Sequence, residues 1–91
     1  MSLDLMLRAL GDPTRREILR ALRVEGDLPA GEIAAKFPMT QASISHHLNV
    51  LREAKLVQSE RQGRNIVYSA NTTVFQDAVE QLLRLLEAGG K

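Results

Sequence analysis

Two changes in the spacing of apolar residues constrain the fold of this chain more than any other feature. Up to Ala54 the apolar residues recur at intervals of three and four, as they do along one face of a helix. From Leu56 to Ser69 apolar and polar residues alternate, which is typical of half-buried strands. Helical spacing then returns after residue 71. The sequence therefore predicts a mainly α fold with one small β-hairpin between the fourth and fifth helices.

Capping residues set the limits of the first two helices. Ser2 is expected to cap a helix over residues 3–10, and Gly11 stands where a C′ glycine would end it. Asp12 is expected to cap a second helix over roughly residues 13–24, because the proline that follows it suits the first helical position. A capping box beginning two residues after Asp12 would shift that first turn slightly.

Prolines and turn residues divide the rest of the chain. Pro29 opens a third helix of about two turns, which Pro38 stops. After a turn of two or three residues, Thr40 is expected to cap a fourth helix over residues 41–54. The hairpin that follows centres on Gly63.

The last helix is expected over residues 72–88. Either Asn71 or Thr72 can cap its start, and the pair Gly89-Gly90 ends it.

Composition limits the class of protein. The 91 residues leave room for one domain, expected to span residues 1–91. A chain of this size buries only about 60% of its unfolded surface, so a second subunit is expected to add burial. The absence of cysteine excludes disulfides, thiol catalysis and thiolate metal sites. No segment has the pattern of a signal peptide or the length of a membrane span, which predicts a cytoplasmic protein.

The third and fourth helices, joined by a short turn, have the arrangement of a helix-turn-helix. The apolar residues Ile44, Leu48 and Leu51 share one side of the fourth helix, and small polar residues occupy the rest. Two arginines lie near the hairpin tip, where they would reach the DNA backbone or minor groove. The residues expected to contact duplex DNA are Thr40, Gln41, Ser43, Ser45, His46, Asn49, Arg61 and Arg64.

A second interpretation of the same polar residues is a helix cap and a solvated surface, and their spacing does not choose between the two. The formal net charge of +1 is too small to predict nucleic-acid binding. The hairpin directly after the helix pair is what favours a DNA-binding protein.

The apolar surface of the last helix is wider than one docking face needs. The first helix is also mostly apolar, so a two-fold interface between copies of the chain is the simplest way to cover both. We therefore expect dimerisation helices at 3–10 and 72–88. The interface residues are expected to be Leu3, Met6, Leu7, Val79, Leu82, Leu83 and Leu86.

Four segments together resemble the ArsR/SmtB family of transcriptional repressors, and within it the metal-independent SdpR-like autorepressors. These segments are GDPTRREIL at 11–19, GEIA at 31–34, SISHHLNVLREA at 43–54, and Gly63-Arg64 ahead of Tyr68. The resemblance spans nearly the whole chain. It implies a winged helix-turn-helix homodimer in which the fourth helix enters the major groove of an operator, the wings touch its flanks, and the first and last helices form the interface.

The chain departs from this family in two ways. Lys55 stands where similar proteins commonly have glycine, and because a left-handed lysine would cost about 1 kcal/mol, we expect a differently built helix end. The family's metal sensors take their ligands from a Cys-x-Cys site around the third helix or from pairs of aspartate and histidine on the last helix, and this chain has neither. We therefore expect no metal and no cofactor, with Asp77, Glu80 and Glu87 forming a solvated surface.

His46 and His47 point about 100° apart on a helix, so they cannot share one ion. His47 is expected to be a partly buried packing residue. The pair Arg15-Arg16 is expected either to meet phosphates or to form a solvated or salt-bridged turn.

Three other functions are weighed against repression. The fold alone also suits a module that binds protein instead of DNA. A metal sensor with a non-standard site is disfavoured by the missing ligands. An enzyme is not expected, because no acid, base and nucleophile group together on these helices. By resemblance, a partner protein that sequesters the dimer is a further expected partner.

Overall fold

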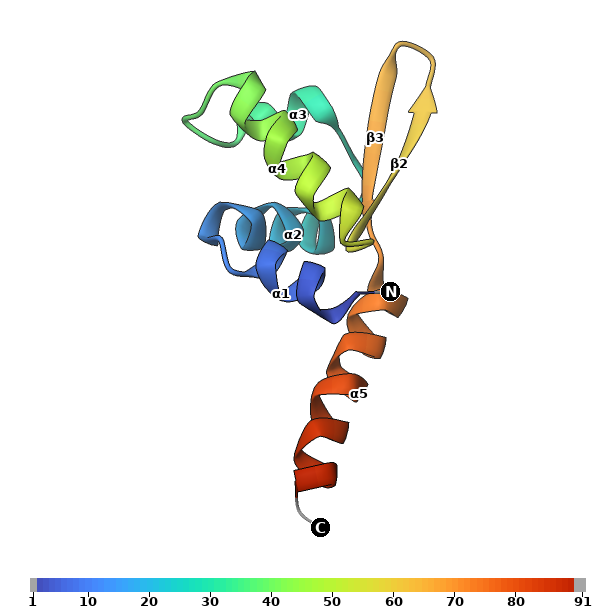
Figure 1. Ribbon diagram of the computed structural model, residues 1–91. Coiled ribbons are helices and arrows are strands. Elements are labelled where there is room, and N and C mark those ends of the chain that lie inside the picture. Colours follow the sequence, from blue (N-terminus) through green and yellow to red (C-terminus); the bar gives the residue numbers. More distant parts are fainter. Residues whose placement is uncertain (1, 90–91) are drawn as a thin grey trace.

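A computed structural model describes residues 2–89 of the chain (Figure 1). The described residues form five helices and one three-stranded sheet, and the hairpin and the last helix extend from opposite ends of the helical body. In chain order the elements are α1 Leu3–Leu10, α2 Pro13–Glu25, β1 Leu28–Pro29, α3 Ala30–Ala35, α4 Gln41–Glu53, β2 Val57–Gln62, β3 Asn65–Ala70 and α5 Thr72–Gly89. The predicted mainly α fold with a β-hairpin wing is confirmed.

The first two helices begin where their capping residues predict. The Ser2 hydroxyl accepts a hydrogen bond from the backbone N–H of Leu5 at 3.2 Å. Asp12 Oδ2 accepts one from the N–H of Arg15 at 3.1 Å, so Asp12 is the cap and the alternative capping box is not used. Gly11 is not the left-handed C′ residue that we expected, because its φ of −72° keeps it in the right-handed region.

The hairpin pairs with a strand that the sequence did not predict. β3 is the central strand, with β2 on one side and the short β1 on the other, all antiparallel. Leu28 of β1 lies opposite Tyr68 of β3. β1 was missed because two residues, one of them a proline, are too few to show an alternating period. At the tip, Gly63 and Arg64 form a two-residue turn, and Gly63 has a φ of 63°. A turn of this kind favours glycine at its first position.

The core lies where α1, α2, α3 and α4 meet the sheet. Its fully buried side chains of largest volume are Met6, Ile18, Ile33, Ile44, Leu48, Leu51, Leu56 and Val57. Met6 corrects one of our expectations. We placed it at the dimer interface, but it is 0% exposed and packs into the core of its own protomer, which leaves it no free surface for a partner.

The last helix projects from the body (Figure 1). It starts at a cap, since Asn71 Oδ1 accepts a hydrogen bond from the N–H of Val74 at 3.3 Å. Only its first half packs on the body, where Ala78 is buried. The Cα radius of gyration is 14.4 Å, against about 12 Å for a compact domain of this length. The expected end at Gly89-Gly90 is met in part: α5 runs to Gly89, and residue 90 lies outside the described residues.

No helix within 2–89 is both long and apolar enough to cross a membrane. In the same range, no three side chains of the types that bind metal ions converge on one point.

Candidate nucleic-acid interface

The helix-turn-helix is formed by α3, a turn over residues 36–40, and α4. The turn is longer than the two or three residues expected, because α3 ends at Ala35, well before Pro38. A residue preceding proline is driven out of the helical region, which explains why Phe37 does not continue the helix. The N–H of Met39 then bonds to the carbonyl oxygen of Phe37 at 2.8 Å, which tightens the chain around Pro38.

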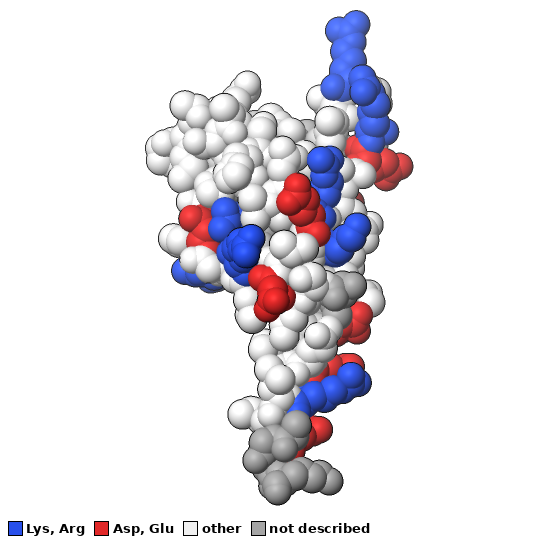
Figure 2. Space-filling model, in the orientation of Figure 1, with Lys and Arg blue, Asp and Glu red and all other residues white. Residues whose placement is uncertain are grey.

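α4 presents a polar side to solvent. Ile44, Leu48 and Leu51 point into the core, as their spacing predicts. The helix is capped by Thr40, whose hydroxyl accepts a hydrogen bond from the N–H of Ser43 at 3.1 Å. All the α4 residues expected to contact DNA are exposed, and they are Gln41, Ser43, Ser45, His46 and Asn49. On the face shown in Figure 2, the surface around the start of α4 is uncharged.

Sequence reasoning missed Arg52, which belongs to the same surface. Its Nη2 donates a hydrogen bond to Asn49 Oδ1 at 3.2 Å, and both residues are exposed. The contact orients the Asn49 amide so that its NH₂ group is free to donate outward. The three-residue separation on one helix was the available signal, because such residues are neighbours on the helix surface.

The end of α4 corrects a second expectation. Lys55 has a φ of 65°, so it adopts the left-handed conformation that we expected the chain to avoid. The N–H of Lys55 bonds to Arg52 O and the N–H of Leu56 to Leu51 O, both at 3.0 Å, which is the hydrogen-bond pattern of a Schellman motif. Ala54 and Leu56 on either side are buried, and their packing holds Lys55 in this conformation.

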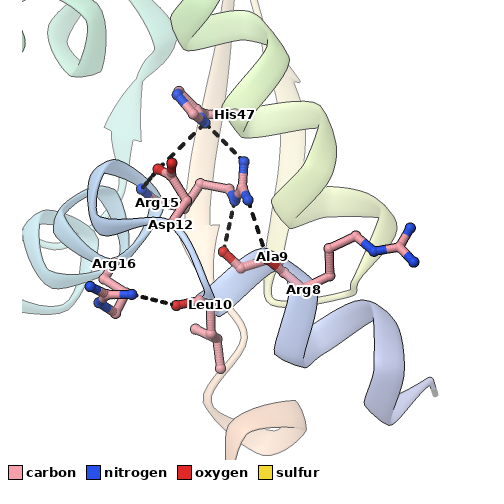
Figure 3. Close-up of polar contacts among 7 residues, drawn as sticks. All are labelled: Arg8, Ala9, Leu10, Asp12, Arg15, Arg16 and His47. Carbon is pink, nitrogen blue, oxygen red and sulfur yellow. Dashed lines mark hydrogen bonds and ion pairs between the residues drawn. The ribbon is translucent and has the colours of Figure 1, made fainter.

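A polar cluster ties α4 to the first two helices (Figure 3). Arg15 is at its centre, with Nε donating to the carbonyl oxygen of Ala9 at 2.7 Å and Nη2 to that of Arg8 at 3.2 Å. Its Nη1 lies 3.1 Å from His47 Nδ1 on α4. One guanidinium therefore donates to two carbonyl oxygens in the last turn of α1 and contacts His47, which holds α4 beside α1.

Asp12 completes this cluster. The backbone N–H of Arg15 donates to its carboxylate, and together with the nearby charge of Arg15 this holds the pKa of Asp12 below its ordinary value. The His47 ring lies 3.9 Å from Asp12 Oδ2, beyond hydrogen-bond length, and nearer to Arg15. Since arginine can only donate, Nδ1 of His47 is the acceptor in that contact. His47 is the partly buried packing residue that we expected.

Arg16 contributes to the same helix end. Its Nη1 donates to the carbonyl oxygen of Leu10 at 2.7 Å. The adjacent pair Arg15-Arg16 thus binds backbone oxygens of α1, a contact that the sequence did not predict, while Arg16 is also exposed, as in the solvated turn that we weighed.

The wing carries the two remaining candidates. Arg61 lies on β2 opposite Ile66, and Arg64 lies in the turn itself; both are exposed. Figure 2 shows basic side chains at the far tip of the hairpin, with an acidic one just below them. The hairpin, α3 and the start of α4 reach toward the same end of the molecule, away from α5 (Figure 1).

This architecture defines a winged helix-turn-helix protein, and the comparisons agree. Residues 10–60 match a family described as a helix-turn-helix domain. The chain is 45% identical over 84 residues to the transcriptional repressor SdpR of Bacillus subtilis (strain 168), covering 92% of each. It is 44% identical over 77 residues to the transcriptional regulator NmtR of Mycobacterium tuberculosis, covering 85% of this chain and 60% of NmtR. An ArsR-like regulator from Rhodococcus sp. RHA1 superposes with a TM-score of 0.86 at 33% identity, covering 97% and 82% of the two chains.

The protein belongs to the ArsR family of helix-turn-helix transcription regulators. It is a DNA-binding regulator of the repressor type and not an enzyme.

Proposed function

We propose that this protein acts as a dimer on a palindromic operator, including one upstream of its own gene, and blocks transcription sterically in the cytoplasm. The observation that carries the proposal is the apolar side of α5. Val79, Leu82, Leu83, Leu85 and Leu86 are all exposed large hydrophobic residues in the protomer. A patch of this kind on one helix favours an interface with another protein surface.

A second copy of the chain suits this surface best. The charged residues of α5 lie along one edge of the helix, and the other side is uncharged (Figure 2). Leu7 on α1 is also exposed, and Leu3 is partly so, which would extend the interface from α5 onto α1. A two-fold axis through this region would place the same patch on both partners. Two α4 helices would then face one duplex on half-sites about one helical turn apart, or a multiple of that distance.

α4 supplies the proposed sequence reading. Gln41, Ser43 and His46 are proposed to contact base edges, because amide, hydroxyl and imidazole groups can donate to or accept from the major groove. The small Ala42 beside them is exposed and lets the helix approach the groove floor. Thr40, Ser45 and Asn49 flank these residues and are proposed to contact phosphates or adjacent bases.

The wing is proposed to bind the DNA backbone. Arg61 and Arg64 would each pair with a phosphate or enter the minor groove beside the half-site. Such contacts add affinity on any sequence and little specificity. Release from DNA by a sequestering partner protein stays a prediction from the family resemblance.

Fluorescence anisotropy across a salt series tests the proposal. The DNA would be the region upstream of the protein's own gene, compared with a random duplex of equal length. We expect the upstream site to bind at least about 10³-fold more tightly. Arg64→Ala should lower the magnitude of the log-affinity against log-salt slope by about 1 per lost contact, and by about 2 in a symmetric dimer.

Arg84→Ala, on the charged edge of α5, is the matched control and should leave the slope unchanged. Equal affinity for the two DNAs would contradict an operator in that region. An unchanged slope for Arg64→Ala would remove the proposed role of the wing.

A further inference from the structure

A groove lies between α2 and the start of α5, and none of its lining residues is among those proposed to contact DNA or a second copy. Its volume is about 430 Å³, within the range of small-molecule sites. The base of the hairpin closes one end of it. Its lining residues are Arg16, Leu19, Arg20, Arg23, Ala70, Thr72, Phe75 and Gln76.

The groove has an apolar floor and a cationic wall. Leu19 is buried, and Ala70 and Phe75 are partly buried against the core. The three arginines recur along α2 at intervals of four and three residues, which places them on one face of the helix. The lining contains no acidic residue.

The arginines keep donors available. Arg16 uses one nitrogen on the carbonyl oxygen of Leu10. Arg20 has a single contact with Glu17 at 3.6 Å, and both side chains are more than half exposed. Within residues 2–89, Arg23 forms no hydrogen bond or ion pair with another side chain. A compact set of guanidinium groups with few partners favours a planar anion such as a carboxylate.

The position of the groove separates it from the DNA-binding surface. In Figure 1, α2 lies between α4 on one side and the start of α5 on the other. Ala70, which lines the groove, is at the end of β3 remote from the hairpin tip. The three arginines are therefore not among the residues proposed to contact DNA.

We propose that this groove binds a small amphipathic anion, with its carboxylate or phosphate head among the arginines and its apolar chain on Leu19 and Phe75, and that binding alters operator affinity. The proposed effect of this ligand on operator affinity rests on the function proposed above. A ligand here would touch both α2, which carries the Arg15 contact to α4, and α5, which carries the proposed interface. A change in the angle between these helices would move the two α4 helices of a dimer relative to each other.

The test uses sodium octanoate as the probe, with 1-octanol and inorganic phosphate as comparisons that each lack one half of the chemistry. Titrations followed by ¹H–¹⁵N NMR should show saturable shifts at the lining residues for octanoate, and at least tenfold weaker binding of the other two. The double variant Arg20→Gln/Arg23→Gln should weaken octanoate binding at least tenfold, because it removes two charged hydrogen-bond donors. Arg84→Gln, an exposed arginine of α5 outside the groove, should bind octanoate like the unaltered protein.

Octanoate binding is measured in the absence of DNA, so a negative result there would leave operator binding unaffected. Absence of saturable octanoate shifts, equal binding by the double variant, or shifts confined to residues 79–86 would overturn the site. Saturating octanoate should also change operator affinity at least fivefold, and by linkage the operator should change octanoate affinity by the same factor. An operator affinity that stays constant would overturn the coupling.

Discussion

α4 and α5 leave opposite surfaces exposed, and the difference lies in how each is attached. α4 is held at its start by Thr40, at its end by the turn through Lys55, and along its length by core leucines and the Arg15 contact. Its apolar side is buried within the protomer, so its exposed side is polar. α5 is held only through its first half, and its apolar side continues into solvent. The helix whose apolar side is buried in the protomer is the one proposed to read DNA, and the helix whose apolar side is exposed is the one proposed to bind a second copy.

The largest expected effect comes from a substitution on the exposed apolar side of α5. Leu86 is 74% exposed in the protomer, so Leu86→Asp should leave the fold of one chain intact. Each of the two copies would lose apolar burial that contributes about 1.5 kcal/mol or more. We therefore expect the dimer dissociation constant to rise at least about 100-fold. Sedimentation at micromolar concentration measures it.

Arg84→Asp places the same residue on the charged edge of α5 and should remain dimeric. A Leu86→Asp protein with the sedimentation of the unaltered protein would show that the exposed leucines have another use.

The next effect concerns the attachment of α4. Arg15→Ala removes the hydrogen bonds to two α1 carbonyls and to His47, so it should lower the free energy of unfolding by about 2–3 kcal/mol. Urea unfolding measures it. Arg20→Ala on the same helix loses only a long, exposed contact and should change stability by less than about 0.5 kcal/mol. Similar losses in both variants would mean that Arg15 does not anchor α4.

The smallest expected effect is at Lys55, where α4 ends. A left-handed non-glycine residue costs about 1–2 kcal/mol, and part of the gain from glycine is offset by its greater freedom when unfolded. Lys55→Gly should therefore raise the free energy of unfolding by about 0.5–1 kcal/mol, seen as a higher urea midpoint. Lys55→Ala keeps the left-handed strain and should show no such gain. A destabilised glycine variant would contradict the strain inferred from the φ of Lys55.

Sequence patterns predicted local structure well because the forces involved are local. The caps at Ser2, Asp12 and Thr40 satisfy N–H groups three residues away, and the apolar face of α4 follows from helical spacing. The resemblance supplied the family. The sequence did not predict β1, whose pairing partner Tyr68 lies 40 positions away from Leu28.

The errors at Met6 and Lys55 share a cause. Met6 lies on a helix that is apolar on more than one side, and spacing cannot say which side meets the protomer's own core. At Lys55, the burial of neighbouring residues outweighs the local preference for glycine. The role of Arg15 was equally hidden, because its contacts join residues from three helices.

The ratio of operator affinity to random-DNA affinity for His46→Ala tests the central claim most directly. If the polar side of α4 reads bases while α5 only assembles the dimer, this variant should remain dimeric. Its operator affinity should fall by about 1–3 kcal/mol, or roughly 5- to 150-fold, and its affinity for random DNA much less. Equal losses on both DNAs, or an unchanged ratio, would contradict the assignment of sequence reading to α4.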